Sequence, residues 1–181
     1  MTRHQQILDT AAELFAKRGF HGVSVHDIGA AVGISGPALY KHFASKDDIL
    51  TQSLIAISEQ LLTEGRKREA ANPAAGDALD ALIEWHIDFA LGHPALIVIQ
   101  EREWTNLDAA GREAVRTLQL DYVDIWVGVL RRLRDDLDPS EARAVVQATF
   151  GLLNSTPHSA RISEQQMRHR LTSMARSALQ A

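Results

Sequence analysis

Cysteine is missing from this chain of 181 residues, which excludes disulfide bonds and thiolate metal sites and is compatible with a reducing compartment. Long apolar runs are missing as well, because no stretch approaches the roughly 18 uncharged residues of a transmembrane helix. The N-terminus lacks the basic-then-apolar pattern of a signal peptide. These absences predict a soluble, cytoplasmic protein that has no membrane partner.

An excess of positive charge, the usual electrostatic sign of a nucleic-acid-binding protein, is also lacking. The formal net charge is −4. Residues 1–50 carry five basic side chains, five acidic side chains and four histidines, so the acidic excess lies in residues 51–181. Any affinity for DNA must therefore depend on where individual side chains and helix N-termini point.

Familiar catalytic patterns do not occur. The sequence holds no Gly-x-Ser-x-Gly element, Walker loop or dinucleotide fingerprint. Side chains that could bind a metal are present as His86, His93, Glu101 and His158, but no His-x-x-x-His pair is found. We therefore predict neither an enzyme nor a cofactor or metal site.

Helical periodicity fills the chain, and no strand pattern interrupts it. Capping residues and apolar stripes predict nine helices. They are expected over residues 2–18, over two short segments within 24–46, from 45 to about 64, and over 77–91, 95–104, 108–136, 139–156 and 164 onward. The fold class is therefore predicted to be all-α.

Residues 24–46 are the most informative stretch, because they predict two short helices joined by a tight turn. Ser24 and Asp27 make a capping box, and Gly33 suits the left-handed residue that ends a helix. Ser35 can cap the next helix, whose first turn tolerates Pro37. Helix, turn and helix is the layout that places its second helix in the major groove of DNA.

At these residues the chain resembles the tetracycline-repressor (TetR) family of bacterial regulators. The matching blocks are Gly22-Val-Ser-Val-His-Asp-Ile, Val32-Gly-Ile-Ser, Leu39-Tyr-Lys-His-Phe and Ser45-Lys-Asp. The resemblance implies a three-helix DNA-binding domain with a helix-turn-helix over residues 1–46. A helical bundle for effector binding and dimerisation would follow over residues 47–181. One departure is His26, which stands where the family often has arginine.

DNA reading requires side chains on the exposed face of the second short helix and near it. The predicted contacts are Ser24, His26, Ser35, Gly36, Ala38, Tyr40, Lys41, His42 and Lys46. In similar proteins the tyrosine after the leucine and the lysine after the next serine hold the DNA backbone, which implies that role for Tyr40 and Lys46. Packing beside Phe43 is the alternative for Tyr40, and His26 is as readily explained as a plain surface residue.

Polar and aromatic side chains stand at inward positions of the later helices, where leucine would be ordinary. The predicted effector-binding residues are Trp85, His86, Phe89, His93, Glu101, Trp104, Tyr122, Trp126, Phe150 and Asn154. Apolar walls with a few polar groups are typical of a small-molecule pocket. The alternative is a core whose polar groups are satisfied by backbone carbonyls. The run from Gly151 to His158 resembles regulators tied to lipid or acyl-thioester metabolism.

Small side chains form a further stripe at spacings of 4, 3 and 4 residues. This candidate dimer face comprises Ala144, Ala148, Gly151 and Ser155, with Ala175 and Ala178 on the last helix. Two such helices from each of two chains would make a four-helix interface. Close packing within one chain is the alternative. A dimer is also what DNA reading demands, because two recognition helices must meet half-sites about one helical turn apart.

We therefore predict a homodimeric, ligand-responsive transcriptional regulator. It would be a repressor that a small apolar or amphipathic effector releases from a palindromic double-stranded DNA operator. The alternative is a helical small-molecule carrier or enzyme with a vestigial DNA-binding domain. Binding of the purified protein to palindromic DNA would separate the two.

Overall fold

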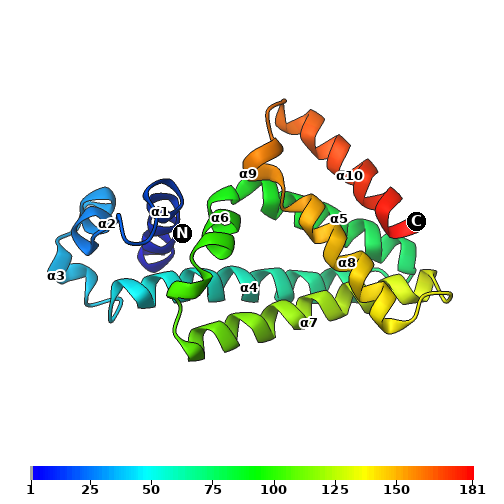
Figure 1. Cartoon of the computed structure of the whole chain (residues 1–181), viewed down its shortest axis with the longest axis horizontal. Helices are drawn as coiled ribbons and strands as arrows, with labels where there is room; N and C mark the ends of the chain where they lie inside the picture. The colour runs from blue at the N-terminus through cyan, green and yellow to red at the C-terminus, as the bar shows by residue number, and fades with distance from the viewer. Residues whose placement is uncertain (1) are drawn as a thin grey trace. The chain divides into compact units, whose positions relative to one another are not determined.

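The computed structural model describes residues 2–181, and these residues form helices without any strand (Figure 1). The predicted all-α fold is confirmed. The α-helices are α1 Arg3–Arg18, α2 Val25–Val32, α3 Gly36–Leu39, α4 Lys46–Ala71, α5 Ala75–Gly92, α6 Pro94–Arg102, α7 Ala109–Leu133, α8 Pro139–Leu153, α9 Thr156–Ser159 and α10 Glu164–Gln180. A 3-10 helix, η1 Trp104–Asn106, follows α6.

One predicted helix is interrupted. The segment expected to be continuous from 139 to 156 ends at Leu153, and Asn154 is its C-cap. Pro157 lies in the first turn of the separate short helix α9. A proline has no N–H and its ring collides with the carbonyl four residues earlier, so α8 cannot continue through it. Residues 2–181 therefore contain one more α-helix than predicted.

The chain divides into two compact units that do not follow the linear sequence. The first combines the chain up to Ser58 with Ala95–Arg116, and the second combines Glu59–Pro94 with Thr117–Ala181. Helices α4 and α7 therefore each contribute residues to both units. The division of roles at residue 46 stays a prediction, because packing alone does not assign roles.

The first unit has its own apolar core. Helix α1 contributes Ile7, Ala11 and Phe15, whose spacing places them on one helical face. They are buried together with Ile28 of α2, Leu39 of α3, Phe43, and Ile49 and Leu50 of α4. Burial of these side chains holds α1, α2 and α3 against the start of α4.

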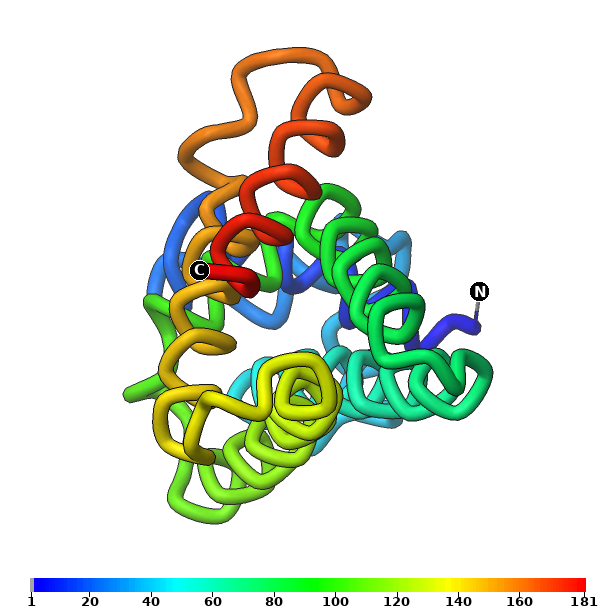
Figure 2. The backbone as a smooth tube through the Cα atoms, turned by 90° about the vertical axis from the view of Figure 1, so that its right-hand side faces the viewer, coloured from blue at the N-terminus to red at the C-terminus, as the bar shows by residue number. Residues whose placement is uncertain are grey.

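The second unit is a bundle of helices in which α10 lies against both α5 and α8 (Figure 2). Its core is apolar and includes Leu82, Ile83, Trp126, Val146, Leu153 and Leu171. Ion pairs border this core, because Arg168 contacts Asp88 at 2.5 Å and Arg176 contacts Asp80 at 2.7 Å. Exposed pairs of this kind contribute little stability, so the apolar core holds α10 in place.

Among residues 2–181 no single helix has both the length and the apolar composition to cross a membrane. Helices α5 and α6 reach that composition only when counted together, and most apolar residues of α5 are buried inside the protein.

Candidate nucleic-acid interface and effector site

The predicted caps of the helix-turn-helix are present. The Asp27 amide donates to Ser24 Oγ at 3.1 Å, and the Ser24 amide donates to Asp27 Oδ2 at 2.8 Å, which completes the capping box. Hydrogen bonding from Ser24 lowers the pKa of the Asp27 carboxyl. The Ala38 amide donates to Ser35 Oγ at 3.3 Å. Both short helices therefore begin where the sequence predicts.

Two glycines shape the turn between these helices. Gly33 has φ +72° and ψ +35°, a left-handed conformation that favours glycine. Gly29 lies inside α2, and a Cβ atom there would stand 2.8 Å from the Ile34 carbonyl oxygen and 3.5 Å from the Gly36 nitrogen. Only glycine lets the turn and the start of α3 approach α2 this closely.

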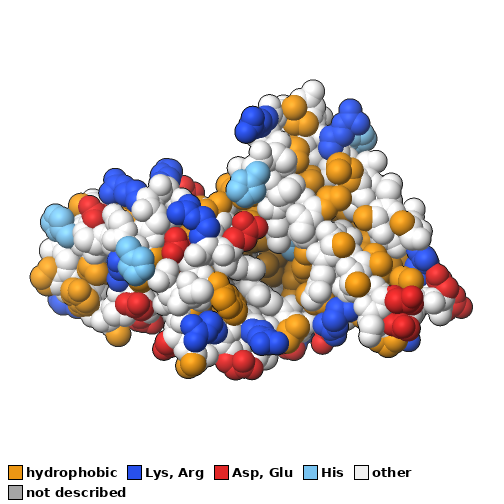
Figure 3. All heavy atoms as spheres, viewed as in Figure 1, with side chains coloured by type: hydrophobic (Ala, Val, Ile, Leu, Met, Phe, Trp, Pro, Cys, Tyr) orange, Lys and Arg blue, Asp and Glu red, His pale blue; other side chains and the backbone are white. Residues whose placement is uncertain are grey.

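Most predicted DNA contacts lie on the surface of this unit. The side chains of Ser24, His26, Ser35, Lys41 and His42 are exposed, and Tyr40 is 56% exposed. Gly36 and Ala38 are half-buried, whereas Leu39 and Phe43 are buried as core residues. Basic and acidic side chains are interspersed on the face seen in Figure 3. This face therefore carries no uniform positive patch, and the individual DNA contacts stay predictions.

Lys46 is engaged inside the protein. Its ammonium donates to the Phe20 carbonyl at 2.8 Å and to the Val23 carbonyl at 2.9 Å, and it lies 4.2 Å from the centre of the Phe20 ring. An ammonium has three N–H donors, so one of them is left for an outside acceptor such as a phosphate. A phosphate contact by Lys46 stays a prediction, and the structure adds a role within the fold.

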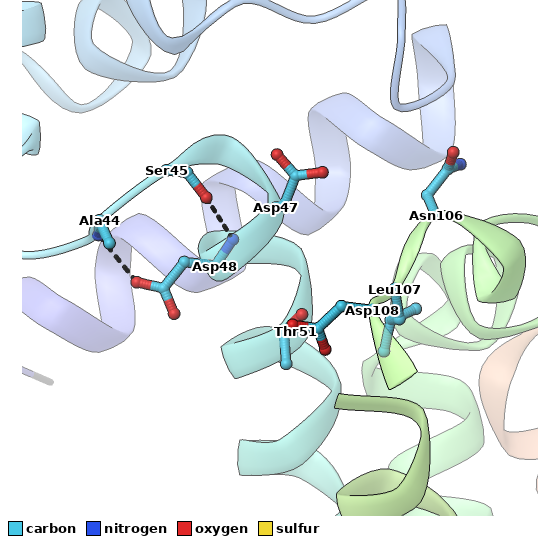
Figure 4. A pocket seen from close by; sticks show the side chains of 8 residues that line it. All are labelled: Ala44, Ser45, Asp47, Asp48, Thr51, Asn106, Leu107 and Asp108. Atoms are coloured by element: carbon cyan, nitrogen blue, oxygen red, sulfur yellow. Dashed lines mark hydrogen bonds between the residues drawn. The ribbon is translucent and has the colours of Figure 1, made fainter. Parts of the chain in front are cut away.

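A hollow beside the start of α4 is acidic (Figure 4). It measures about 460 Å³ and is lined by Ala44, Ser45, Asp47, Asp48, Thr51, Asn106, Leu107 and Asp108. Asp48 accepts from the Ala44 amide at 2.8 Å and donates its own amide to Ser45 Oγ at 3.0 Å, which caps α4 (Figure 4). Nearby carboxylates disfavour a phosphate here. Within residues 2–181 no group of three or more His, Asp or Glu side chains could hold a metal ion.

The second unit brings together three polar members of the predicted effector site, His86, Tyr122 and Asn154. His86 Nε2 lies 3.0 Å from Asn154 Oδ1, and His86 Nδ1 lies 3.3 Å from the Tyr122 hydroxyl. Burial lowers the pKa of His86 to about 4, although the hydrogen bond with Asn154 opposes it, and burial raises the pKa of Tyr122. His86 is therefore neutral at pH 7. The Tyr122 hydroxyl donates to Nδ1, and Nε2–H donates to the asparagine carbonyl.

Aromatic rings surround this imidazole. His86 stacks on Phe150 with ring centres 4.5 Å apart, and Trp126 stands edge-on to it at 5.9 Å. Phe89 approaches at 5.7 Å, also edge-on. Trp126 is fully buried, and its indole Nε1, like that of Trp85, makes no hydrogen bond of good geometry with the described residues, although Trp126 lies close enough to the Tyr122 hydroxyl to oppose the rise in its pKa. The histidine of the cluster is therefore paired internally, and the indole N–H of Trp126 is the donor that an acceptor atom could still reach.

The other predicted effector residues are more dispersed. Trp85 is half-buried beneath the guanidinium of Arg68, 4.6 Å from the ring centre. His93 is exposed and stacks on Phe89. Glu101 and Trp104 belong to the first unit, so their part in an effector site stays a prediction.

The small-residue stripe is largely open. Ala144, Ala148 and Gly151 are exposed on α8, and a Cβ atom at Gly151 would meet nothing within 4 Å. Ser155 and Ala178 are half-buried. Ala175 is fully buried in the core of its own chain, which corrects the expectation that it faces a partner. Helix α10 instead presents Met174, which is 52% exposed.

Sequence reasoning missed one buried carboxylate in the first unit. Glu103 is only 6% exposed, and it accepts from the Phe20 amide at 3.2 Å and from the Asn106 side-chain amide at 2.8 Å. Its partner Phe20 lies 83 positions earlier in the chain, so no local pattern could have indicated the contact.

Two family models match this chain, one in its N-terminal part and one in its C-terminal part. Residues 7–52 match the family model described as bacterial regulatory proteins, tetR family. Residues 72–179 match the model of a tetracyclin repressor-like C-terminal domain.

Named relatives and solved structures agree with these matches. The chain is 30% identical over 146 residues to the transcriptional repressor KstR2 of Mycobacterium tuberculosis, covering 76% of this chain and 72% of KstR2. It is 23% identical over 160 residues to a fatty acid metabolism regulator of Bacillus subtilis, covering 85% of this chain and 81% of that protein.

The fold recurs in solved structures at low sequence identity. A TetR-family regulator of Bordetella parapertussis has a TM-score of 0.83 at 21% identity and covers 95% of this chain and 93% of its own. FadR of Bacillus subtilis, solved with stearoyl-CoA, has a TM-score of 0.77 at 20% identity and covers 98% and 96%. AibR, solved with isovaleryl coenzyme A and operator DNA, has a TM-score of 0.74 at 21% identity and covers 96% and 97%.

Proposed function

The chain belongs to the tetR family of bacterial regulatory proteins, and on that premise we propose that it is a homodimeric, cytoplasmic repressor that an acyl-coenzyme A thioester releases from a palindromic operator. The observation that carries the effector part is the buried cluster of His86, Tyr122, Phe150 and Trp126 with Asn154. The helix-turn-helix of the first unit carries the DNA part.

On the DNA side, α3 is the element that enters the major groove. Ser35, Gly36 and Ala38 lie at its start, where the Ala38 methyl group can meet a thymine methyl. Tyr40, Lys41 and His42 follow on the exposed side and would contact bases or phosphates. Ser24 and His26 begin α2 and would hold the DNA backbone, together with the remaining N–H of Lys46.

A dimer would present two such helices to two half-sites. The open stripe of Ala144, Ala148 and Gly151 on α8 lets a second helix approach closely, and Met174 of α10 supplies exposed apolar surface for it. Ser155 and Ala178 would complete the edges of this face.

The effector class is argued from chemistry and from relatives. Aromatic rings suit an acyl chain, and a thioester carbonyl can accept from the indole N–H of Trp126 or Trp85, neither of which makes a hydrogen bond of good geometry with the described residues. FadR and AibR were solved with acyl-coenzyme A molecules, and a further relative is named for fatty acid metabolism. These titles support the same class of ligand here.

Release would follow from a shift between two populations of the protein. Helix α4 runs from the first unit into the second, so a change in the second unit can reach the DNA-binding helices along a continuous element. An effector shifts the equilibrium only if it binds the released conformation more tightly than the DNA-bound one.

The test begins with DNA. The purified protein is used to select an operator from a random double-stranded pool, and binding is then titrated with isovaleryl-, octanoyl- and stearoyl-coenzyme A. We expect a palindromic consensus and release by at least one thioester but not by free coenzyme A. Failure to select any sequence would favour the carrier or enzyme alternative, and selection without release would refute the effector class.

A further inference from the structure

We propose that Glu103 and Lys46 clamp the backbone of Phe20, Glu103 by its N–H and Lys46 by its C=O, and that Glu103 is thereby a positioning residue for DNA reading by α3. The clamp lies entirely within the first unit. The proposal rests on the proposed function, because the placement of α3 matters only if α3 reads DNA.

The two hydrogen bonds hold the two backbone groups of one residue, which belong to consecutive peptide bonds. The Phe20 N–H donates to Glu103 Oε1 at 3.2 Å, and the Phe20 C=O accepts from Lys46 Nζ at 2.8 Å. Glu103 is held in turn by the Asn106 amide, which donates to Oε2 at 2.8 Å. Phe20 itself is buried at 4% exposure, so neither of its backbone groups can turn to water without opening the fold.

The clamped segment is the loop that delivers the chain into α2. Lys46 also binds the Val23 carbonyl at 2.9 Å, and Val23 directly precedes Ser24, the N-cap of α2. Helix α2 is locked to the turn and to α3 through the close approach at Gly29. Holding the α1–α2 loop in place therefore determines the position of α2 and, through it, the position of the exposed face of α3.

A second contact from the end of α6 reaches the helix turn just before this loop. Arg102 Nη1 donates to the Ala16 carbonyl at 3.1 Å in the last turn of α1. Arg102 and Glu103 thus contact the segment immediately before and within the loop. Because α6 follows α5 directly in the chain, these contacts make α6 an element through which the second unit can act on the DNA-binding helices.

A buried carboxylate is costly unless its oxygens accept hydrogen bonds, so a position that only fills space would more readily hold an apolar side chain. Glutamine can also accept from the Phe20 N–H, whereas leucine cannot. Comparing the glutamine and leucine variants therefore shows whether residue 103 acts by hydrogen bonding or only by filling space.

The experiment compares Glu103→Leu and Glu103→Gln with the parent on the DNA sequence selected by the parent. The matched control is Glu113→Leu, an exposed glutamate of α7 in the same unit. We expect Glu103→Leu to bind that DNA at least about tenfold more weakly, and Glu103→Gln to stay within about threefold of the parent. Amide hydrogen exchange at Phe20 should accelerate by at least about tenfold in Glu103→Leu alone.

The proposal is overturned if Glu103→Leu binds DNA like Glu113→Leu, or if Glu103→Gln is as weak as Glu103→Leu. Should Glu103→Leu not fold, Asn106→Ala decides, because it removes only the second hydrogen bond of Glu103. Unchanged Phe20 exchange and DNA binding in Asn106→Ala would then refute the clamp. Failure of the proposed function can be told apart from failure of the clamp, because the parent protein would then select no DNA. In that case the amide exchange rate of Phe20 still tests the clamp.

Discussion

His86 illustrates, at the scale of single residues, how burial sets the chemistry of a side chain. The sequence places this histidine on an inward stripe, but its ionisation depends on what surrounds it. Phe150, Tyr122 and Trp126 exclude water from the imidazole, so the pKa of His86 falls to about 4 and the ring is neutral at pH 7. A neutral imidazole can donate and accept at once, which is what Asn154 and Tyr122 require.

The first prediction concerns this hydrogen-bonded trio. Replacing His86 with leucine alone removes the partner of the half-buried Asn154 and of the buried Tyr122 hydroxyl, and it should lower the free energy of unfolding by about 1–3 kcal/mol. Combining His86→Leu with Asn154→Leu and Tyr122→Phe removes all three polar partners together. We expect the combined variant to be more stable than His86→Leu, as measured by urea unfolding.

The combined variant also tests the effector site. It should bind the selected operator like the parent but no longer release it when an acyl-coenzyme A is added. A stable variant that still responds normally to the thioester would remove His86, Tyr122 and Asn154 from the proposed effector site.

The second prediction concerns pH. Because the pKa of His86 is about 4 in the folded protein and near 6.5 in the unfolded chain, the unfolded state binds more protons between these values. The stability contributed by neutral His86 is therefore complete above about pH 6.5 and declines as the pH falls toward 4. Between pH 7 and pH 5 the loss should be roughly 2 kcal/mol.

The measurement for this second prediction is urea unfolding of the parent and of the combined variant at both pH values. The difference between the two proteins isolates His86 from the other histidines, and equal pH slopes would contradict the assignment.

At the scale of elements, the turn between α2 and α3 is defined by glycines at two positions. Gly33 was predicted from its place at a helix end, and its left-handed backbone confirms it. Gly29 was counted merely as part of a helix. Its role appears only when the Ile34 carbonyl is seen to lie where a Cβ atom would stand.

The third prediction follows from this close approach. Gly29→Ala should lower the free energy of unfolding by about 1–3 kcal/mol, because backbone must move to admit the methyl group. Gly128→Ala is the control, since a Cβ atom there meets nothing within 4 Å and alanine favours helix interiors by about 1 kcal/mol. The two variants should thus shift chemical denaturation midpoints in opposite directions. A Gly29→Ala variant as stable as the parent would show that the turn relaxes freely.

At the scale of the whole molecule, two chains are needed to read a palindrome. Ala144, Ala148 and Gly151 remain exposed on α8 in a single chain although their size suits close helix packing. Ala175 is used inside the chain instead, so the proposed interface combines the α8 stripe with Met174 rather than with Ala175.

The fourth prediction tests this interface. Gly151→Leu should leave the single chain folded, because its side chain enters open space, yet it should separate the two copies. Sedimentation velocity should show monomer where the parent shows dimer, and operator affinity should fall by at least about tenfold through loss of the second half-site. Gly128→Leu, equally open and outside the proposed face, is the matched control. A Gly151→Leu dimer of normal stability would place the interface elsewhere.

The sequence by itself determined the local structure and the family. Caps such as Ser24, Ser35 and Asp138 act on neighbours within three residues, so their spacing alone places the starts of α2, α3 and α8. Because these capping interactions are local, the helix-turn-helix could be recognised from the sequence, and its residues indicated the tetR family. It also indicated that His86 and Asn154 stand at inward positions of their helices.

Only the tertiary structure decided how distant segments combine. Residues 95–116 join the first unit although they follow the helices of the second, and Glu103 reaches the Phe20 amide across 83 positions. The contacts of the Lys46 ammonium with two carbonyls of the α1–α2 loop also appear only in the structure, whereas its contact with phosphate stays a prediction. Side-chain partners of this kind depend on which surfaces meet when apolar cores close, and periodicity along one helix carries no information about them.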